Sequence, residues 1–393
     1  MNMKLFLSSG LLLATLLTLS ALTGCVNEGL EPVFYALEIE QSLTDDRGLE
    51  DNITVQRIVK DTVTNRYFAA AGTLYTRTDG NDLDKDRWAA VAPPVPWALC
   101  NTVEVFGSPA WMYVGFISKS GTGLGLWRID PAALGSGWQE ITDAAVNDMQ
   151  IIMLRSLNDG TDRLYVSTKS GSTDSLFHST NGTAFTSVTI NNPPATPTPI
   201  TDVAWNGVNY WAVLGPTLYW DNVGGLTSLE PYIGGTPAAN HRLGALHYSA
   251  TLGRLFVGSD NGISYSWNGA AWTESSPQKV DDKEVRFTAI AEVTVTTTPP
   301  PISPNDIYWG TGGSGFYFFA DGLVDAPPAR SPAFTVSALY NGAVNSMLYD
   351  GAVTPQKPYE NLFIGTSGAG LWRGDWVLVD PDKNKWDWQW KQE

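Results

Sequence analysis

Short segments of aromatic and aliphatic residues recur along this chain, each followed by a small residue and then by a second segment of the same kind. Tyr67–Ala70 precedes Leu74–Tyr75 in this way, and Leu362–Gly365 precedes Leu371–Trp372. The fourth residue of the first segment falls at positions 70, 115, 167, 214, 258, 310 and 365. Such segments predict β-strands bounded by turns, and we expect the small residue to allow a sharp turn into the next strand.

The interval between successive copies, 44 to 55 residues, predicts a repeated unit of four strands with their loops. That is the size of one blade of a β-propeller, in which sheets stacked around an axis cover each other's apolar faces. The sequence therefore predicts an all-β fold over residues 33–393, a seven-bladed β-propeller of four-stranded antiparallel blades. Two segments of alternating apolar and polar residues, 33–40 and 386–391, are expected to pair in the blade that closes the ring.

Three further fragments repeat in phase with these strands. One pair lies upstream of the counted position, where the innermost strand of a blade is expected. Two pairs lie downstream, where the third strand turns into the fourth. The pairs are Ala145–Met149 with Ala343–Met347, Ser179–Thr186 with Ser266–Thr273, and Asp82–Trp88 with Asp380–Trp386. A common phase in three unrelated fragments favours one repeat architecture over two separate domains.

The start of the chain has the pattern of an export signal. Lys4 is the only charged residue before position 28, and residues 5–21 are almost wholly apolar. A short positive start followed by an apolar stretch of this length is typical of a signal peptide. A retained membrane span usually needs about 20 apolar residues, so we expect residues 1–24 to be removed.

The leader ends in four residues that resemble the bacterial lipobox: Leu22, Thr23, Gly24 and Cys25. The resemblance implies cleavage after Gly24, lipid including palmitate on the Cys25 thiol, and a short tether over residues 25–32. Several acyl chains on one residue would hold the protein firmly on a membrane of the cell envelope. Val26 replaces the aspartate that retains lipoproteins at an inner membrane, which favours the outer membrane in a cell that has two. Ordinary secretion with an unrelated cysteine is the alternative.

Composition limits the classes of partner. The net charge of −16 argues against nucleic acid and against binding anionic headgroups through charge. The chain has two cysteines, and lipid on Cys25 would leave Cys100 without a disulfide partner. We expect Cys100 to be a small buried apolar residue.

Two of the repeated turns resemble a degenerate Asp-box, the bacterial neuraminidase repeat of sialidase-like propellers. The segments are Ser179–Phe185 and Ser266–Trp272, in which asparagine replaces the usual aspartate and the spacing is one residue short. The resemblance implies a structural turn whose polar side chain binds backbone N–H groups, so it concerns fold and not activity. No Phe-Arg-Ile-Pro-like motif marks a first catalytic arginine, and no catalytic residue is carried over.

Two acidic stretches are similar to the opening of a calcium-binding loop. They are Asp82, Asp84 and Asp86 in one, and Asp380, Asp382 and Asn384 in the other. Arg87 and Lys385 stand at the sixth position, where such loops need glycine. The histidines His178, His241 and His247 share no metal-ligand spacing. We therefore expect no metal or other cofactor, with calcium as the open alternative.

The sequence favours a non-enzymatic, lipid-anchored scaffold that binds another envelope protein or a glycan through loops of the propeller. The alternative is a sialidase-like enzyme that binds or processes glycans. Such an enzyme needs charged residues that converge in the central funnel. The candidates from predicted inner strands are Arg57, Asp148, Asp202, Arg242 and His247. Clustering of these side chains in a pocket would favour the enzyme, whereas scattered or salt-bridged side chains would favour the scaffold.

Overall fold

The computed structural model divides the chain into two compact units, Met1–Asp45 and Asp46–Glu393, and describes residues of the second unit alone. They are residues 48–49, 52–78, 87–135, 137–170, 173–194, 198–221, 228–232, 241–280, 283–296, 306–319, 339, 342–353, 357–380 and 385–393. The predicted signal peptide, the lipobox with Cys25, and segment 33–40 lie outside the described residues. Within these ranges, no helix is long and apolar enough to cross a membrane.

The described residues form antiparallel meanders, in which each strand pairs with the next one along the chain. The first sheet contains β1 (Arg57–Asp61), β2 (Arg66–Ala71), β3 (Thr73–Thr78) and β4 (Ala89–Val91). The second sheet contains β5 (Leu99–Phe106), β6 (Trp111–Ile117), β7 (Gly123–Ile129) and β8 (Gln139–Glu140).

The next two meanders share one eight-stranded sheet, because their outer strands pair in parallel with Thr189 opposite Ser228. The first of them contains β9 (Gln150–Asn158), β10 (Asp162–Ser170), β11 (Thr173–Ser179) and β12 (Thr186–Ile190). The second contains β13 (Ile200–Trp205), β14 (Tyr210–Leu214), β15 (Thr217–Trp220) and β16 (Ser228–Pro231).

Three more meanders complete the described part of the unit. They contain β17 (Leu243–Ser249), β18 (Arg254–Ser259), β19 (Ser264–Trp267) and β20 (Trp272–Glu274); β23 (Phe287–Val293), β24 (Asp306–Thr311) and β25 (Phe316–Phe319); and β26 (Ala343–Asp350), β27 (Asn361–Ser367), β28 (Leu371–Asp380) and β29 (Lys385–Gln392). A separate short hairpin consists of β21 (Lys279–Val280) and β22 (Lys283–Glu284).

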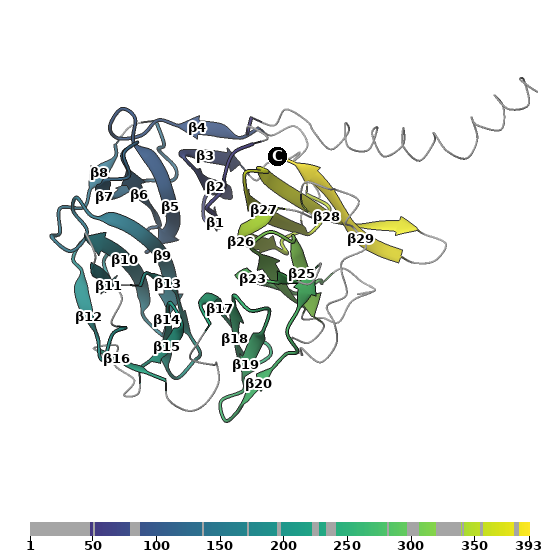
Figure 1. Ribbon diagram of the computed structural model, residues 1–393. Helices are drawn as coiled ribbons and strands as arrows, with labels where there is room; N and C mark the ends of the chain where they lie inside the picture. Colours follow the sequence, from purple (N-terminus) through teal and green to yellow (C-terminus); the bar gives the residue numbers. More distant parts are fainter. Residues whose placement is uncertain are drawn as a thin grey trace, which may run out of the picture. The chain divides into compact units, whose positions relative to one another are not determined.

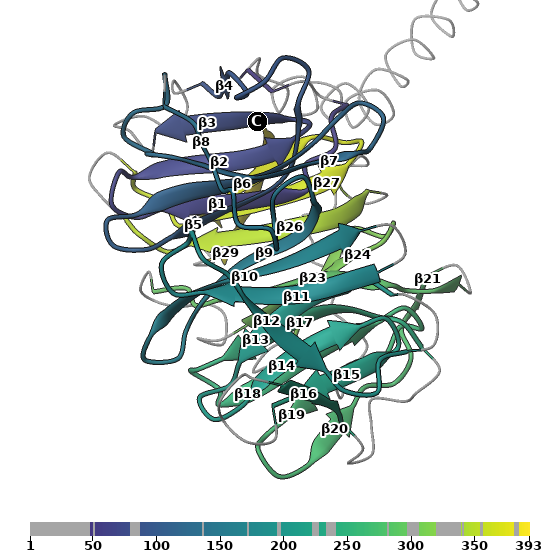
Figure 2. The ribbon, with the colours of Figure 1, turned by 90° about the vertical axis from the view of Figure 1, so that its left-hand side faces the viewer.

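The first strand of each meander is innermost, and the sheets stand around a common axis (Figure 1). In the order β1, β5, β9, β13, β17, β23 and β26, each innermost strand contacts the next, and β26 contacts β1. Figure 2 shows β6, β10 and β14 of successive sheets stacked one above the other. This is the arrangement of a β-propeller, so the predicted all-β fold of four-stranded antiparallel sheets is confirmed. Two meanders share a sheet and one has three described strands, so the number of blades stays a prediction.

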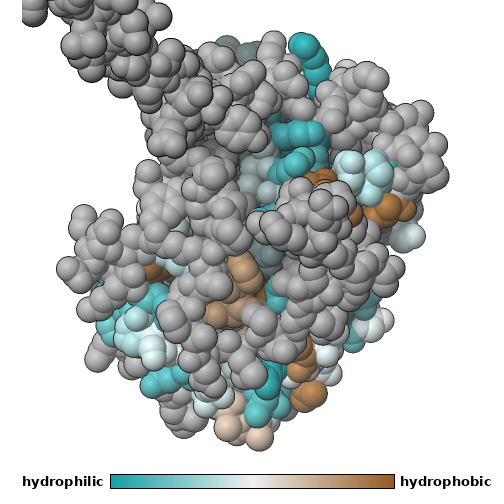
Figure 3. Space-filling model, turned by 90° about the vertical axis from the view of Figure 1, so that its right-hand side faces the viewer, coloured by the Kyte–Doolittle hydropathy of each residue, from teal (hydrophilic) through white to brown (hydrophobic). Residues whose placement is uncertain are grey.

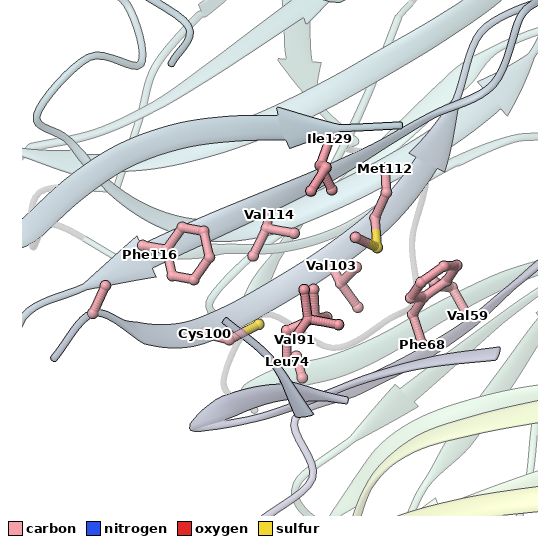
Figure 4. Close-up of a cluster of buried hydrophobic side chains, with 12 residues drawn as sticks. Val59, Phe68, Leu74, Val91, Cys100, Val103, Met112, Val114, Phe116 and Ile129 are labelled. Atoms are coloured by element: carbon pink, nitrogen blue, oxygen red, sulfur yellow. The ribbon is translucent and has the colours of Figure 1, made fainter. Parts of the chain in front are cut away.

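The hydrophobic core lies between the faces of neighbouring sheets. Between the first two sheets, Val59 and Phe68 meet Val103 and Val114 (Figure 4), and all four side chains are buried. Burial of apolar surface contributes about 25 cal/mol per Å², and here the buried surface comes from two sheets at once. Cys100 is free and buried in the same cluster, which confirms its expected role. No single sheet can bury such a cluster alone.

The small residue of the repeated segment has a role other than the predicted one. Gly115, Gly310 and Gly365 lie inside β6, β24 and β27, and none of them has a positive φ. A Cβ on Gly310 would lie 2.5 Å from Cγ1 of Val344 in the next sheet, and one on Gly365 would lie 2.8 Å from Cγ1 of Val55. The expectation of a sharp turn at these positions is therefore wrong. Glycine lets the second strand of one sheet approach the start of the next sheet.

Innermost strands are joined to one another through bulges. The pairing of β5, β23 and β26 with their second strands shifts by one residue near the start of the strand, which leaves an extra residue free to point elsewhere. At each of these bulges, the extra side chain donates a hydrogen bond to a carbonyl of the next innermost strand or the residues that lead into it. The pairs are Asn101 Nδ2 with Ile151 O at 2.7 Å, Thr288 Oγ1 with Val344 O, and Asn345 Nδ2 with Val55 O at 3.2 Å.

The first and last sheets meet at a seam that contains buried charges. Asp350 of β26 accepts hydrogen bonds from Lys60 of β1 at 2.6 Å, and from Tyr67 and Lys357. Burial alone would raise the pKa of Asp350. The hydrogen bonds from Lys357, Lys60 and Tyr67 outweigh burial and hold the pKa at about 2, below the usual 3.8. The carboxylate is therefore ionised, and it is a counter-charge to both lysines.

The C-terminal strand also reaches this seam. The strand predicted over residues 386–391 is confirmed as β29, and its partner is β28 of the same sheet. Beyond β29, the side chain of Glu393 accepts hydrogen bonds from Arg77 of β3 and from Trp88 Nε1, the latter at 3.1 Å. Among the described residues, the last sheet takes all four of its strands from one meander, while its end contacts the first sheet. The predicted partner segment 33–40 lies outside the described residues.

The repeated fragments do not all lie where their phase predicts. Ser179–Thr186 and Ser266–Thr273 join third strands to fourth strands, as predicted, and Ala343–Met347 lies in β26. Ala145–Met149, however, forms a turn ahead of β9. The prediction of an innermost strand there is wrong, because Asp148 has a φ of 56° and ends any extended backbone.

Replacing Gly310 by alanine is expected to force the two adjoining sheets apart locally. The new Cβ would lie 2.5 Å from Val344 and 3.1 Å from Ala289, so Gly310→Ala should lower the free energy of unfolding by about 1–3 kcal/mol. Urea unfolding followed by circular dichroism measures the change. Gly135→Ala is the matched control, because nothing lies within 4 Å of its added Cβ. Equal stability of the two variants would show that close approach is not what requires glycine.

Acid should weaken the seam at Asp350. A carboxyl whose pKa is held below its unfolded value contributes stability above about pH 4, and this contribution is lost as the pH falls toward about 2. Asp350→Asn should therefore unfold at lower urea concentration than the wild type at pH 5, and the gap should narrow between pH 4 and pH 2. Urea unfolding at several pH values tests this. A gap that stays constant over that range contradicts the assigned ion pairs.

Candidate functional site

A cavity of about 310 Å³ lies at the axis among residues of β1, β9, β13, β17, β23 and β26. Its lining includes two arginines, one aspartate and one histidine: Arg57, Arg155, Asp202 and His247. We call this cavity the central pocket. A second hollow of about 160 Å³, among the bulges at the start of the innermost strands, shares Arg57, Arg155 and Asp202 with it. Charged side chains thus stand where the two hollows adjoin.

The arginines of the central pocket are held by carboxylates of neighbouring strands. Nη2 of Arg57 lies 2.8 Å from Oε2 of Glu104 on β5, and Nε of Arg155 lies 2.6 Å from Oδ1 of Asp202 on β13. The two pairs join β1 to β5 and β9 to β13, so they connect successive sheets around the axis. Partial burial of all four side chains makes removal of either partner more disruptive than at an exposed ion pair.

Asp202 is fixed by the backbone as well. Its Oδ1 accepts a hydrogen bond from the Val203 N–H at 3.0 Å, and Oδ2 accepts one from the Leu246 N–H at 3.2 Å. With Arg155, three donors from three strands converge on this carboxylate. Asp202 is therefore a structural centre of the pocket, with little acceptor capacity left for a ligand.

Glu104 pairs with Arg57 but does not itself line the central pocket. Burial raises the pKa of Glu104 to about 8, whereas backbone hydrogen bonds from Val105 and Ser156 lower it and the charge of Asp202 raises it. A carboxyl in this setting can exchange a proton near neutral pH.

His247 lies on the far wall, with Nε2 at 3.7 Å from Oε2 of Glu292 on β23. Burial alone would raise the pKa of Glu292, but its interactions with His247, Thr251 and Ser249 lower that pKa. The Glu292 carboxyl is thus an ionised neighbour of His247. The contact between His247 and Glu292 joins β17 to β23, as the two arginine pairs join their strands.

The five funnel candidates separate into two groups. Arg57, Asp202 and His247 line the central pocket. Asp148 lies exposed in the turn before β9, and Arg242 lies exposed before β17, so neither lines it. The turn conformation at Asp148 explains its displacement from the predicted inner strand.

Sequence reasoning missed Arg155, Glu104 and Glu292. A signal for the first two was present: each is a lone charged residue inside an apolar strand, in Met-Leu-Arg and Val-Glu-Val. In the structure, Glu104 pairs with Tyr113 and Arg155 pairs with Tyr165, the second residue of the repeated segment in both cases. In both cases, a charged residue paired with that aromatic residue lies on an innermost strand, close to the axis.

The predicted calcium stretches are not tested by the structure. Asp82, Asp84, Asp86, Asp382 and Asn384 lie outside the described residues. Among the residues that are described, no group of three or more His, Cys, Asp or Glu side chains could hold a metal ion.

The Asn-containing turns have the structural role that the resemblance implied. Oδ1 of Asn181 accepts hydrogen bonds from the N–H groups of Thr183 and Ala184, both at 2.9 Å. Oδ1 of Asn268 does the same for Ala270 and Ala271, at 3.0 and 2.9 Å. Both asparagines satisfy backbone donors in turns between outer strands, so they contribute to the fold and not to the central pocket.

Comparison with known proteins gives the fold class. No protein-family model and no curated protein matches the chain. Among solved structures, YCF48 from Cyanidioschyzon merolae is similar with a TM-score of 0.55 and 13% identity, over 83% of this chain and 96% of that one. The extracellular domain of BT4673 from B. thetaiotaomicron has a TM-score of 0.56 and 11% identity, over 84% of this chain and 41% of that one. The WD40 β-propeller domain of Doa1 has a TM-score of 0.52 and 11% identity, over 83% and 93%. Identities this low show the fold alone: this chain is a β-propeller.

The two aspartates nominated from the sequence should respond differently to the same substitution. Asp202→Asn removes the counter-charge of Arg155 and sets an amide against backbone N–H groups, so we expect a loss of about 2–4 kcal/mol in the free energy of unfolding. Asp148→Asn should change it by less than about 0.5 kcal/mol, because Asp148 is exposed and asparagine accepts a positive φ. Chemical denaturation measures both, and a similar loss in the two variants contradicts the assignment.

Proposed function

We propose that this chain is a non-enzymatic, lipid-anchored propeller of the cell envelope that binds another envelope protein through one end of its ring. The observation that carries the proposal is a set of exposed apolar side chains on hairpins that join first strands to second strands. Val63 lies between β1 and β2, and Val208 lies between β13 and β14, with 79% and 68% of their surface exposed. Val353 and Tyr359, between β26 and β27, are also exposed.

These hairpins lie at the same end of the ring, because each follows the innermost strand of its meander. Two aromatic residues of the central pocket lie toward that end as well. Trp205 is the last residue of β13, and Tyr248 is the last but one of β17. Exposed apolar side chains around a concave centre with aromatic walls are typical of a surface that contacts a protein.

One side of the ring is visible in Figure 3. Among the coloured residues in Figure 3, hydrophobic side chains form separate spots between hydrophilic ones. Apolar side chains scattered singly are normal for any protein surface. We assign partner contact to the hairpin end of the ring, where Val63 and Val208 are exposed.

The charged groups of the central pocket support binding more than catalysis. Arg57 is paired with Glu104, and Asp202 accepts hydrogen bonds from Arg155 and two backbone N–H groups. A hydrolytic site needs an acid, a base or a nucleophile that can reach the substrate. Because these charged groups interact with one another, they favour a scaffold over the sialidase-like alternative.

Peptide binding by a protein of similar fold supports the binding part of the proposal, and the lipobox supports attachment to the envelope. YCF48, a propeller of similar fold, has been solved bound to D1 peptide, so this architecture can present a peptide-binding surface. Attachment to the envelope depends on the lipobox residues Leu22, Thr23, Gly24 and Cys25. Lipid on Cys25 would concentrate the propeller at the membrane where its partner is found.

The test is affinity capture from detergent-solubilised envelopes, with wild-type protein and a Val63→Glu/Val208→Glu variant. We expect the wild type to retain one protein partner and the variant to retain at least tenfold less of it, because charge at the tips opposes burial. Trp97→Glu is the control, since Trp97 is 69% exposed and lies between β4 and β5, at the opposite end of the ring from these hairpins. Palmitate labelling should depend on Cys25 and not on Cys100. Retention of sugars but no protein by the wild type would contradict the proposal.

A further inference from the structure

We propose that the central pocket binds a carboxylate group carried by an extended peptide segment, held between Arg57 and Arg155. The inference rests on the proposed function, because it names the chemistry of the segment that a partner protein would insert. The carboxylate is that of an acidic side chain or of a chain end. The pocket would then select its partner by charge and geometry, while the exposed hairpin residues supply contact area.

Both arginines have donors that the protein does not use. Arg155 directs Nε at Asp202, and its two terminal nitrogens have no partner among the described residues. Arg57 directs one terminal nitrogen at Glu104, and its Nε is buried without a hydrogen-bond partner in the described part of the chain. A guanidinium that is already oriented by one carboxylate is well placed to bind a second carboxylate with its remaining donors.

By contrast, the carboxylate that lines the pocket is already occupied by donors of the protein. Asp202 is the one carboxylate among the described residues that line the pocket, and three donors already occupy it. Sugar hydroxyls must donate as well as accept, and the Asp202 carboxylate has little capacity left to accept from them. An ionised carboxylate has nothing to donate. The balance of donors over acceptors therefore favours a carboxylate over a sugar.

Part of the wall is apolar or aromatic and suits a peptide, while His247, Thr288 and Asn345 add polar groups. Leu157, Trp205, Tyr248, Ile290 and Met347 line the pocket with the two arginines. A volume of about 310 Å³ is at the lower limit of small-molecule sites, so it admits one acidic residue with parts of its neighbours. The molecule's net charge of −16 repels free anions. A ligand must therefore combine its carboxylate with apolar contacts, which small inorganic anions lack.

The experiment is isothermal titration of the full chain with matched short peptides. The probes are acetyl-Leu-Glu-Leu-amide, acetyl-Leu-Gln-Leu-amide, and the glutamine peptide with a free C-terminal carboxylate. We expect the glutamate peptide or the free-carboxylate peptide to bind tenfold to a hundredfold more tightly than the neutral peptide. That range corresponds to about 1.4–2.7 kcal/mol for a charge-assisted pair. The two acidic probes distinguish a side chain from a chain end.

Variants identify the residues that are responsible. Arg155→Lys keeps a positive charge beside Asp202 but removes the planar fork, so affinity for the acidic probe should fall about tenfold with the fold intact. Arg155→Gln should abolish the preference for the acidic probe. Arg163→Gln is the matched control, because Arg163 has the same exposed fraction of 24% and a similar pair with Asp159, but does not line the pocket.

Three results would overturn the inference: equal affinity for the charged and neutral peptides, no binding of any peptide at millimolar concentration, or binding of N-acetylneuraminic acid in place of the peptides. Its failure can be told apart from failure of the proposed function. If the wild type and Arg155→Lys capture the envelope partner equally, the scaffold stands and the carboxylate site falls. If the wild type captures no partner, the proposed function itself is contradicted.

Discussion

Packing between the faces of neighbouring sheets is the constraint on which the rest of this structure depends. Each sheet has an apolar face that only the next sheet can cover, as the cluster around Phe68 and Val103 shows. Close approach is therefore needed at every interface. Gly310 and Gly365 permit it, since any side chain there would meet the next sheet. The functional region at the axis exists because the sheets converge to this degree.

Near the axis, the contacts between neighbouring sheets change from apolar packing to hydrogen bonds and ion pairs. Bulges at Asn101, Thr288 and Asn345 turn side chains toward the neighbouring innermost strand, where they bind its carbonyl groups. One step further along the strands, Arg57 and Arg155 pair with carboxylates across two other interfaces, β1 with β5 and β9 with β13. The charged groups of the pocket thus hold the ring together and shape its centre. A binding site made from such groups is rigid before any ligand arrives, which reduces the entropy lost on binding.

The sequence was sufficient for the fold class and for part of the site. Strand and turn positions were predictable because hydrophobic segments such as Leu362–Gly365 repeat at blade spacing. Arg57, Asp202 and His247 could be nominated because they precede those segments at similar distances. Asp148 was misplaced because its turn interrupts the phase, and a one-dimensional repeat cannot show a positive φ. Ion pairs between sheets, such as Arg155 with Asp202, depend on how far each sheet turns about the axis. No local sequence pattern encodes that rotation.

The backbone pairing of β12 with β16 at the outer edge of the ring affects how the ring resists opening. β12 and β16 share backbone hydrogen bonds, Thr189 opposite Ser228, so two meanders form one continuous sheet. The other described meanders meet their neighbours through side-chain contacts and scattered hydrogen bonds. Under tension or partial denaturation, these other junctions separate with less resistance than a backbone ladder. The eight-stranded pair would then persist as a single cooperative block, and the ring would open at an interface away from it.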